Sequence, residues 1–166
     1  MAPLAHALTV RPATLADAER IAFVHATSWR ETYGRHVDDP DSSPWFAVEP
    51  RVAMWRTNLT EQVLSTVVAL DGAEIVGFAA VQPTPTSDDG SPVRPEELTM
   101  LYVLARAHGT GAGQALLDAV LGDRPASLWV ADDNPRAQAF YRRNGFVADG
   151  AASSFGPIER SRRIVR

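Results

Sequence analysis

The sequence predicts a single domain of the α+β class. Its 166 residues are 45% hydrophobic and 22% charged, which is the composition of one globular domain. The expected elements follow the order β-α-α-β-β-β-α-β-α-β-β, and this order lacks the regular alternation that builds a parallel sheet. No internal repeat is visible at the periods typical of solenoid proteins. These three observations favour one mixed sheet covered by a few helices.

The first half of the chain predicts two helices and three strands. Thr14 is a suitable N-cap for a helix that continues to about Tyr33, with apolar residues at helical spacing. A loop rich in Pro, Asp and Ser follows and carries Trp45 and Phe46. Asp71-Gly72 joins two β-branched runs and is a strong hairpin signal. The expected strands are 7–11, 65–70 and 74–81, the loop is 35–49, and the second helix is around 51–59.

The second half predicts two more helices and four more strands. An exposed loop with four prolines precedes a strong strand and a glycine-rich turn. Asn134-Pro135 predicts a helix start, with asparagine at the N-cap and proline at the first helical position. Asn144-Gly145 predicts the end of that helix. The expected loop is 82–95, the strands are 97–104, 127–131, 146–149 and 158–165, and the third helix ends near residue 121.

The charged and reactive residues exclude several classes of chemistry. All 16 basic side chains are arginine, and the chain has no cysteine. It therefore lacks the lysine of a P-loop, a Schiff-base lysine, a disulfide framework and a cysteine nucleophile. A net charge of −4 argues against a nucleic-acid partner. Neither a signal peptide nor a membrane span is expected, so we predict a cytoplasmic protein.

Three alternating glycines follow the strand at 97–104 and open the third helix. Gly109, Gly111 and Gly113 would let the backbone approach a ligand, and the first helical turn offers free N–H groups. This design suits a pyrophosphate and needs no lysine. A turn that merely joins strand to helix is the structural alternative. A dinucleotide-binding unit also competes, but its third glycine would fall at Gln114, and little sequence remains for a doubly wound sheet.

Several motifs together resemble the GNAT family of acyl-CoA-dependent N-acetyltransferases over nearly the whole chain. The run His108–Gly113 is similar to the family's Gln/Arg-x-x-Gly-x-Gly/Ala signature, although histidine stands where glutamine or arginine is usual. Leu101-Tyr102-Val103 resembles the fourth strand of the family, and the segment 134–146 resembles its N-x-R-A…F-Y…G-F block. The resemblance implies a mostly antiparallel sheet of six to seven strands with splayed central strands, flanked by about four helices.

The resemblance also implies a site for acetyl-CoA as co-substrate. Backbone groups of Leu101 and Val103 would pair with the pantetheine arm, and the glycine turn would bind the pyrophosphate. Asn134 reads equally well as a helix N-cap and as a contact to the cofactor arm. The implied cofactor-binding residues are Leu101, Tyr102, Val103, His108, Gly109, Thr110, Gly111, Ala112, Gly113, Gln114, Asn134 and Tyr141.

Two residues are candidates for proton transfer. By resemblance Tyr141 would protonate the departing thiolate, although it can also be read as a core aromatic beside Phe140. An amine acceptor must lose a proton before it attacks, so a base is expected. Glu97 occupies the position of a catalytic glutamate in some family members, and strand alternation would place it on one face with Thr99 and Leu101. A solvated charge beside Glu96 is the alternative reading.

Four aromatic residues are candidates for the acceptor pocket: Trp29, Tyr33, Trp45 and Phe46. Acidic loop residues point to a cationic acceptor such as a polyamine, an aminoglycoside or a peptide amine, unless they are merely solvated. Those residues are Asp38, Asp39, Asp41, Glu49, Asp88, Asp89 and Glu96. We expect His25 to be a core histidine and no metal to be bound, because the four histidines are scattered.

The sequence therefore predicts direct transfer of an acetyl group from acetyl-CoA to a primary amine in a ternary complex. A non-catalytic module that senses acyl-CoA is the first alternative, and a small dinucleotide-binding protein is the second. The last strand carries Arg160, Arg162, Arg163 and Arg166. It would form a protected sheet edge or part of a homodimer contact.

Overall fold

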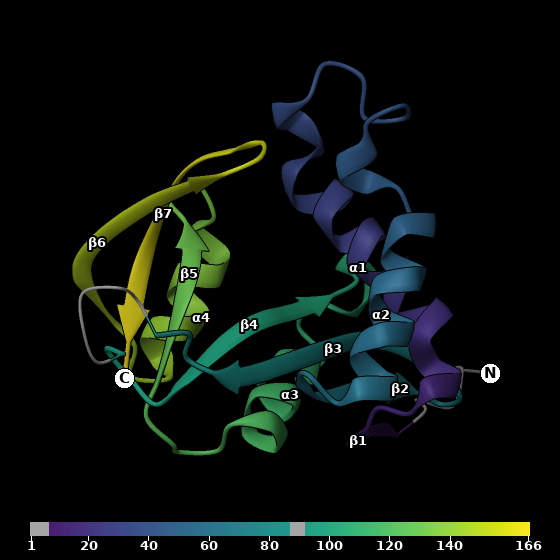
Figure 1. Cartoon of the computed structure of the whole chain (residues 1–166), viewed down its shortest axis with the longest axis horizontal. Helices are drawn as coiled ribbons and strands as arrows, with labels where there is room; N and C mark the ends of the chain where they lie inside the picture. Colours follow the sequence, from purple (N-terminus) through teal and green to yellow (C-terminus); the bar gives the residue numbers. More distant parts are fainter. Residues whose placement is uncertain (1–6, 87–91) are drawn as a thin grey trace.

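One seven-stranded sheet with helices on both faces forms the domain (Figure 1). The computed structural model describes residues 7–86 and 92–166, so Asp88 and Asp89 lie outside the described part. The strands are β1 (Leu8–Pro12), β2 (Ser65–Asp71), β3 (Glu74–Pro83), β4 (Glu96–Val103), β5 (Ala126–Ala131), β6 (Val147–Phe155) and β7 (Ile158–Val165). The α-helices are α1 (Ala18–Tyr33), α2 (Glu49–Glu61), α3 (Ala112–Val120) and α4 (Pro135–Arg143). Short 3₁₀ turns are η1 (Leu15–Asp17), η2 (Gly34–His36), η3 (Pro44–Phe46) and η4 (Ala105–Ala107).

The strand order β1-β2-β3-β4-β5-β7-β6 confirms a mixed, mostly antiparallel sheet. Among the seven described strands only β4 and β5 run parallel, and they pair at just two positions, Glu96 with Ala126 and Glu97 with Ser127. Beyond that point the two strands diverge, which gives the splayed centre that the resemblance implies. Figure 1 shows the result as two half-sheets, β1–β4 and β5–β7–β6, that open away from this shared corner. This is not the parallel, doubly wound sheet of a dinucleotide-binding fold.

A separate apolar core lies on each face of the sheet. On one face α3 and α4 contribute Leu116, Leu117 and Tyr141, which pack against Leu128 of β5. On the other face α1 and α2 pack against β2 and β3, with Ile21, Val24, Trp55, Val68 and Phe78 among the buried residues. The alternation of strand side chains therefore assigns each residue of β4 and β5 to one of these two faces.

A β-bulge in β4 corrects the expected face of Glu97. The register with β3 shifts between Ala80, which pairs with Met100, and Val81, which pairs with Leu98. As a result Leu98 and Leu101 both pack on the α3–α4 face, whereas Met100 and Tyr102 pack on the α1–α2 face. Glu97 precedes Leu98, so it lies on the α1–α2 face and not on the face of Leu101.

The last two strands differ from the sequence-based expectation. β6 continues to Phe155, because the register shifts twice along its pairing with β7 and the hydrophobic alternation is interrupted there. The arginine-rich strand β7 lies between β5 and β6, so the prediction that it forms a sheet edge is wrong. Three of its arginines pair instead with carboxylates of the same half-sheet, Arg160 and Arg162 with Asp132 and Arg163 with Asp149. Within residues 7–86 and 92–166, no helix is long and apolar enough to cross a membrane.

Candidate active site

A cavity of about 510 Å³ occupies the opening between the splayed strands. Its walls come from β4 and β5, and the ends of α1, α3 and α4 complete it. Pairing between β4 and β5 stops after Glu97 and Ser127, so the backbone edges beyond this point are free for a ligand. A volume of this size fits a small molecule or the end of an extended one.

The free edge of β4 presents polar backbone groups to the cavity. The Leu104 N–H donates to the Val76 carbonyl on β3 at 2.9 Å. Alternation then directs the N–H and C=O groups of Leu101 and Val103 to the opposite edge, where β5 has diverged. His108 Nε2 lies 2.9 Å from the Val103 carbonyl oxygen. The histidine that replaces the usual glutamine or arginine thus turns back onto the strand end.

The glycine turn forms a cradle of N–H groups at the start of α3. Gly109 and Gly111 adopt positive φ angles of 78° and 90°, and an added Cβ would meet no atom within 4 Å at either position. Glycine is therefore required by backbone conformation and not by crowding. Among the described residues, the N–H groups of Gly109, Gly111, Gly113 and Gln114 find no acceptor. These donors lie at a helix N-terminus, where an anion such as pyrophosphate is stabilised.

Thr110 has a structural role in this turn. Its hydroxyl donates to the Ala107 carbonyl at 2.7 Å and accepts from the Ala112 N–H at 3.4 Å. Thr110 is also the one implied cofactor-binding residue that does not line the cavity; the other eleven do. Gln114 lines the cavity but also bonds to Asn144, and so ties α3 to the end of α4.

Tyr141 lies in the wall of the cavity and in the core at the same time. Its side chain is 8% exposed and contacts the rings of Phe140 and Phe146. Burial raises the pKa of Tyr141, and the neighbouring Tyr102 and Tyr33 add to this rise. The phenol therefore remains protonated near neutral pH and can donate a proton or a hydrogen bond. No other described residue forms a hydrogen bond with its hydroxyl, which leaves that group available to a ligand.

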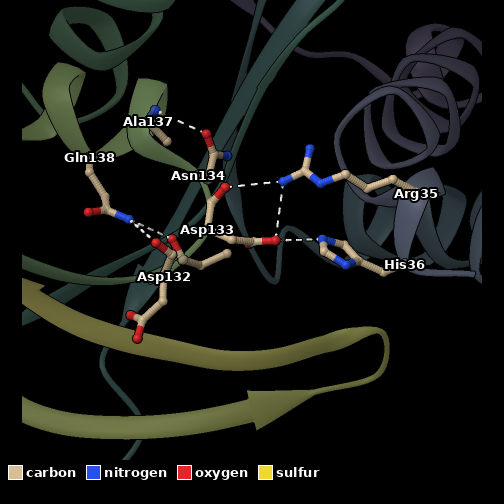
Figure 2. Close-up of polar contacts among 8 residues, drawn as sticks. Arg35, His36, Asp132, Asp133, Asn134, Ala137 and Gln138 are labelled. Atoms are coloured by element: carbon tan, nitrogen blue, oxygen red, sulfur yellow. Dashed lines mark hydrogen bonds and ion pairs between the residues drawn. The ribbon is translucent and has the colours of Figure 1, made fainter.

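Asn134 caps α4, and it also lines the cavity. Its Oδ1 accepts from the Ala137 N–H at 3.1 Å, as Figure 2 shows. Both interpretations of this residue from the sequence thus remain compatible with the geometry.

The residue before Asn134 connects the two halves of the molecule. Asp133 Oδ2 lies 2.5 Å from His36 Nε2 and 3.2 Å from Arg35 Nη2, and both partners belong to η2 after α1 (Figure 2). The Arg35 guanidinium also donates to the Asp133 carbonyl at 3.1 Å. We call Arg35, His36 and Asp133 the inter-half bridge, because it joins the α1 side of the cavity to the β5–α4 side.

Glu97 lies at the corner where β4 and β5 part, outside the residues that line the cavity. Gln82, its partner on β3, donates from Nε2 to Glu97 Oε1 at 3.4 Å. Ser127, its partner on β5, is buried, and no described residue forms a hydrogen bond with its hydroxyl. Because Glu97 and Tyr102 share the α1–α2 face, the carboxylate lies on the opposite side of the sheet from the glycine cradle and α3.

The predicted acceptor residues form an aromatic layer, but only Tyr33 lines the cavity. Trp29 and Phe46 are buried in a third core cluster with Tyr33. Trp45 stacks on Trp29 with ring centroids 6.3 Å apart. The aromatic layer of Trp29, Trp45 and Phe46 thus packs behind Tyr33, outside the cavity wall.

The sequence analysis missed several cavity residues. Ser28, Thr32, Trp129, Arg136 and Arg143 all contribute to the wall. Trp129 could have been found as the polar-face position of a strand that otherwise alternates with buried Leu128 and Val130. Arg136 lies inside the N-x-R-A motif and could have been found there. Ser28 carried no signal, since its importance depends on the packing of α1.

His25 is the core histidine that the sequence predicts. Its side chain is 8% exposed, stacks on Tyr102 and accepts a hydrogen bond from Trp55 Nε1 at its Nδ1. Burial lowers the pKa of His25 to about 3, with a further contribution from the Arg51 charge. The imidazole is therefore neutral near pH 7, and it packs against the ring of Tyr102.

The splayed strands and the glycine cradle define the class: the chain belongs to the GNAT family of acetyltransferases and is an acyl-CoA-dependent enzyme. The model of the acetyltransferase (GNAT) domain matches residues 62–148, which include β4, the cradle and α4. An uncharacterised N-acetyltransferase of Mycobacterium tuberculosis is 30% identical over 142 residues, covering 82% of this chain and 86% of that relative. Another, from Bacillus subtilis, is 31% identical over 136 residues, covering 77% and 74% respectively.

Solved structures share the fold over nearly the full length. A protein described as histone acetyltransferase HPA2 and related acetyltransferase, from Corynebacterium glutamicum, has a TM-score of 0.69 at 26% identity, covering 98% of this chain and 96% of that one. The PaiA N-acetyltransferase of Thermoplasma acidophilum, solved in complex with coenzyme A, has a TM-score of 0.65 at 17% identity, covering 95% and 98%.

Proposed function

We propose that this protein transfers an acetyl group from acetyl-CoA directly to a primary amine within a ternary complex. The observation that carries the proposal is the joint placement of three groups around one cavity. These are the unpaired N–H groups of the glycine cradle, the free edge of β4, and the Tyr141 hydroxyl. Each group meets one part of a thioester co-substrate: the pyrophosphate, the pantetheine arm and the sulfur.

The cradle and the strand edge position acetyl-CoA. The pyrophosphate accepts from the N–H groups of Gly109, Gly111, Gly113 and Gln114, so no lysine is required. The pantetheine amides pair with Leu101 and Val103 as an added strand would. A β4 N–H then faces the thioester carbonyl and stabilises the oxyanion that forms when the amine attacks.

Proton transfer completes the reaction. The amine nitrogen bonds to the thioester carbon and the carbon–sulfur bond breaks. The nitrogen gives up a proton as the amide forms, and that proton restores the Tyr141 phenol after the sulfur has taken a proton from Tyr141. Because burial raises the pKa of Tyr141, this transfer is uphill as a separate step and must accompany bond cleavage. The ammonium form of the acceptor passes its proton through a bridging water molecule to the Glu97 carboxylate, since Glu97 itself does not line the cavity.

Calorimetric titration with acetyl-CoA, followed by assay of thiol release with a panel of amines, tests the proposal. We expect acetyl-CoA to bind with a micromolar Kd and at least one primary amine to release CoA. Absence of binding at millimolar acetyl-CoA would refute the proposal. Binding without turnover of any amine would instead support the sensing module that the sequence analysis kept as an alternative.

A further inference from the structure

Aromatic rings form the acceptor-side walls of the cavity. Tyr33 of α1, Tyr102 of β4 and Trp129 of β5 all contribute to its surface. Trp129 is 40% exposed, whereas Tyr33 is 7% exposed. A tryptophan left open in a cavity is a large apolar surface that gains free energy when a ligand covers it.

The alternation of β5 places Trp129 on the side of the acceptor. Leu128 and Val130 pack in the core beneath α3 and α4, so Trp129 and Ala131 face α1. Ala131 confirms this orientation, because it packs with Trp29 and Tyr33. Trp129 is also the first residue on this face beyond Ser127, where pairing with β4 ends.

One side of the Trp129 ring is already covered. Arg163, its partner on β7, places its guanidinium carbon 5.8 Å from the ring centroid. The ring therefore has an arginine over one face, while the residue stays 40% exposed and contributes to the cavity wall. A side chain held in this way offers a preorganised stacking surface, which reduces the entropy lost when a ligand binds.

The cavity wall contains no carboxylate within the described ranges, although it contains Arg136 and Arg143. Acidic groups of the 35–49 loop and of the β5–α4 turn already have partners: Asp41 pairs with Arg30, Asp133 with Arg35 and His36, and Asp39 with Ser42. On the acceptor side the remaining polar groups of the wall are neutral hydroxyls, and that of the buried Ser28 has no hydrogen-bond partner in the part of the chain that the structure describes. A second ammonium group would therefore find no counter-charge among these residues.

The acceptor end of the molecule is also closed by contacts between distant segments. At the tip of the β6–β7 hairpin, an added Cβ on Gly156 would come within 2.8 Å of the Trp45 ring, and Phe155 packs on the same ring. The inter-half bridge is the second contact that joins the two sides of the cavity at this end. Closure at two points leaves room for a small molecule rather than for a polypeptide that extends past the site.

From these observations we infer that the acceptor is a small primary amine with a single ammonium group and an aromatic ring that stacks on Trp129. This inference rests on the proposed function and names the substrate class of the same site. It replaces polyamines, aminoglycosides and peptides as the first choice. Tyr102 also contributes to the cavity wall, and His25 stacks on its ring.

Steady-state assays with three amines and three variants test the inference. The amines are 2-phenylethylamine, hexylamine and putrescine, and the variants are Trp129→Ala, Trp129→Phe and Phe23→Ala. Phe23 is the matched control: its ring is 41% exposed and lies 4.6 Å from the Arg20 guanidinium carbon, but it does not line the cavity. Titration of 2-phenylethylamine into the protein saturated with CoA measures acceptor binding independently of turnover.

We expect 2-phenylethylamine to be used at least tenfold more efficiently than putrescine. Trp129→Ala should weaken its binding and raise its KM about tenfold. The Kd of acetyl-CoA should stay within twofold, Trp129→Phe should restore most of the loss, and Phe23→Ala should change nothing. Equal or better use of putrescine, or unchanged 2-phenylethylamine binding in Trp129→Ala, would overturn the inference.

The titration separates this inference from the proposed function. If 2-phenylethylamine binds in a Trp129-dependent manner but no amine is acetylated, the acceptor class stands and the catalytic proposal fails. If another amine is acetylated while 2-phenylethylamine does not bind, the catalytic proposal stands and the acceptor class fails.

Discussion

Tyr141 is the single residue whose hydroxyl the proposed chemistry needs most. The change Tyr141→Phe removes that oxygen and keeps the ring that packs against Phe140 and Phe146. We expect kcat to fall about 100-fold, because general acid catalysis typically contributes this much or more. The Kd of acetyl-CoA should not change beyond twofold. Steady-state kinetics and calorimetry together check both values, and an unchanged kcat would reduce Tyr141 to a core residue.

His25 predicts a specific loss of stability in acid. Its pKa is lowered from 6.5 to about 3 by burial and by the Arg51 charge. Between these two pH values the imidazole is therefore protonated in the unfolded chain and neutral in the folded chain. The stability from this residue is fully present above pH 6.5 and decreases by about 1.4 kcal/mol per pH unit below it. The decrease ends near pH 3.

The change His25→Gln tests this linkage. The variant should be less stable at pH 7 because the stacking on Tyr102 is lost. Between pH 6.5 and 4.5, however, its free energy of unfolding should fall less steeply than that of the unmodified protein. Urea unfolding at several pH values provides the comparison. Asp17 does not interfere in this pH range, because its pKa is lowered and its protonation affects stability only below about pH 4. Parallel slopes for the two proteins would contradict the prediction.

At the scale of an element, a substitution in the glycine turn before α3 can distinguish the cost of backbone strain from the loss of ligand binding. Gly111→Ala places a side chain at φ 90° with free space around it, so we expect a loss of about 1–2 kcal/mol from backbone strain. Gly150→Ala is a matched control, with φ 94° and equally free space in β6. Both variants should lose similar stability in urea unfolding. Only Gly111→Ala should raise the Kd of acetyl-CoA, about tenfold or more.

The same comparison of elements shows what the sequence can predict. The glycine turn, the Asn134-Pro135 helix start and the Asp71-Gly72 hairpin were all readable, because each is a local backbone requirement of a particular residue type. The bulge in β4 was not readable, because it arises from the register with β3 and leaves no turn signal in the sequence. That one extra residue moved Glu97 to the other face of the sheet.

At the scale of the molecule, the site exists because the two half-sheets meet at only two residue pairs. The family resemblance gave this splay, and the periodicity of the sequence alone did not. The contacts that close the acceptor end of the cavity could not be predicted, since they join residues about 100 positions apart, such as Arg35 and Asp133. Trp129 was not predicted as an acceptor residue for the same reason, because it lies about 100 positions along the chain from the α1 residues on its side of the cavity.

The inter-half bridge should control the acceptor site without stabilising the fold. Asp133→Asn removes the charge that faces Arg35 and His36, whereas Asp132→Asn removes a charge paired with Arg160 and Arg162 inside one half-sheet (Figure 2 shows both aspartates). Exposed ion pairs contribute at most about 1 kcal/mol, so both variants should unfold near the concentration of urea that unfolds the parent.

Only Asp133→Asn should raise the KM of the acceptor, by about threefold to tenfold, because of these two aspartates only Asp133 pairs across the two halves of the molecule. High salt should shift the parent towards the variant, since it screens the same exposed charges. Steady-state kinetics at 0.05 M and 0.5 M salt measure both effects. Equal KM values for the two variants would show that the bridge does not set the acceptor site.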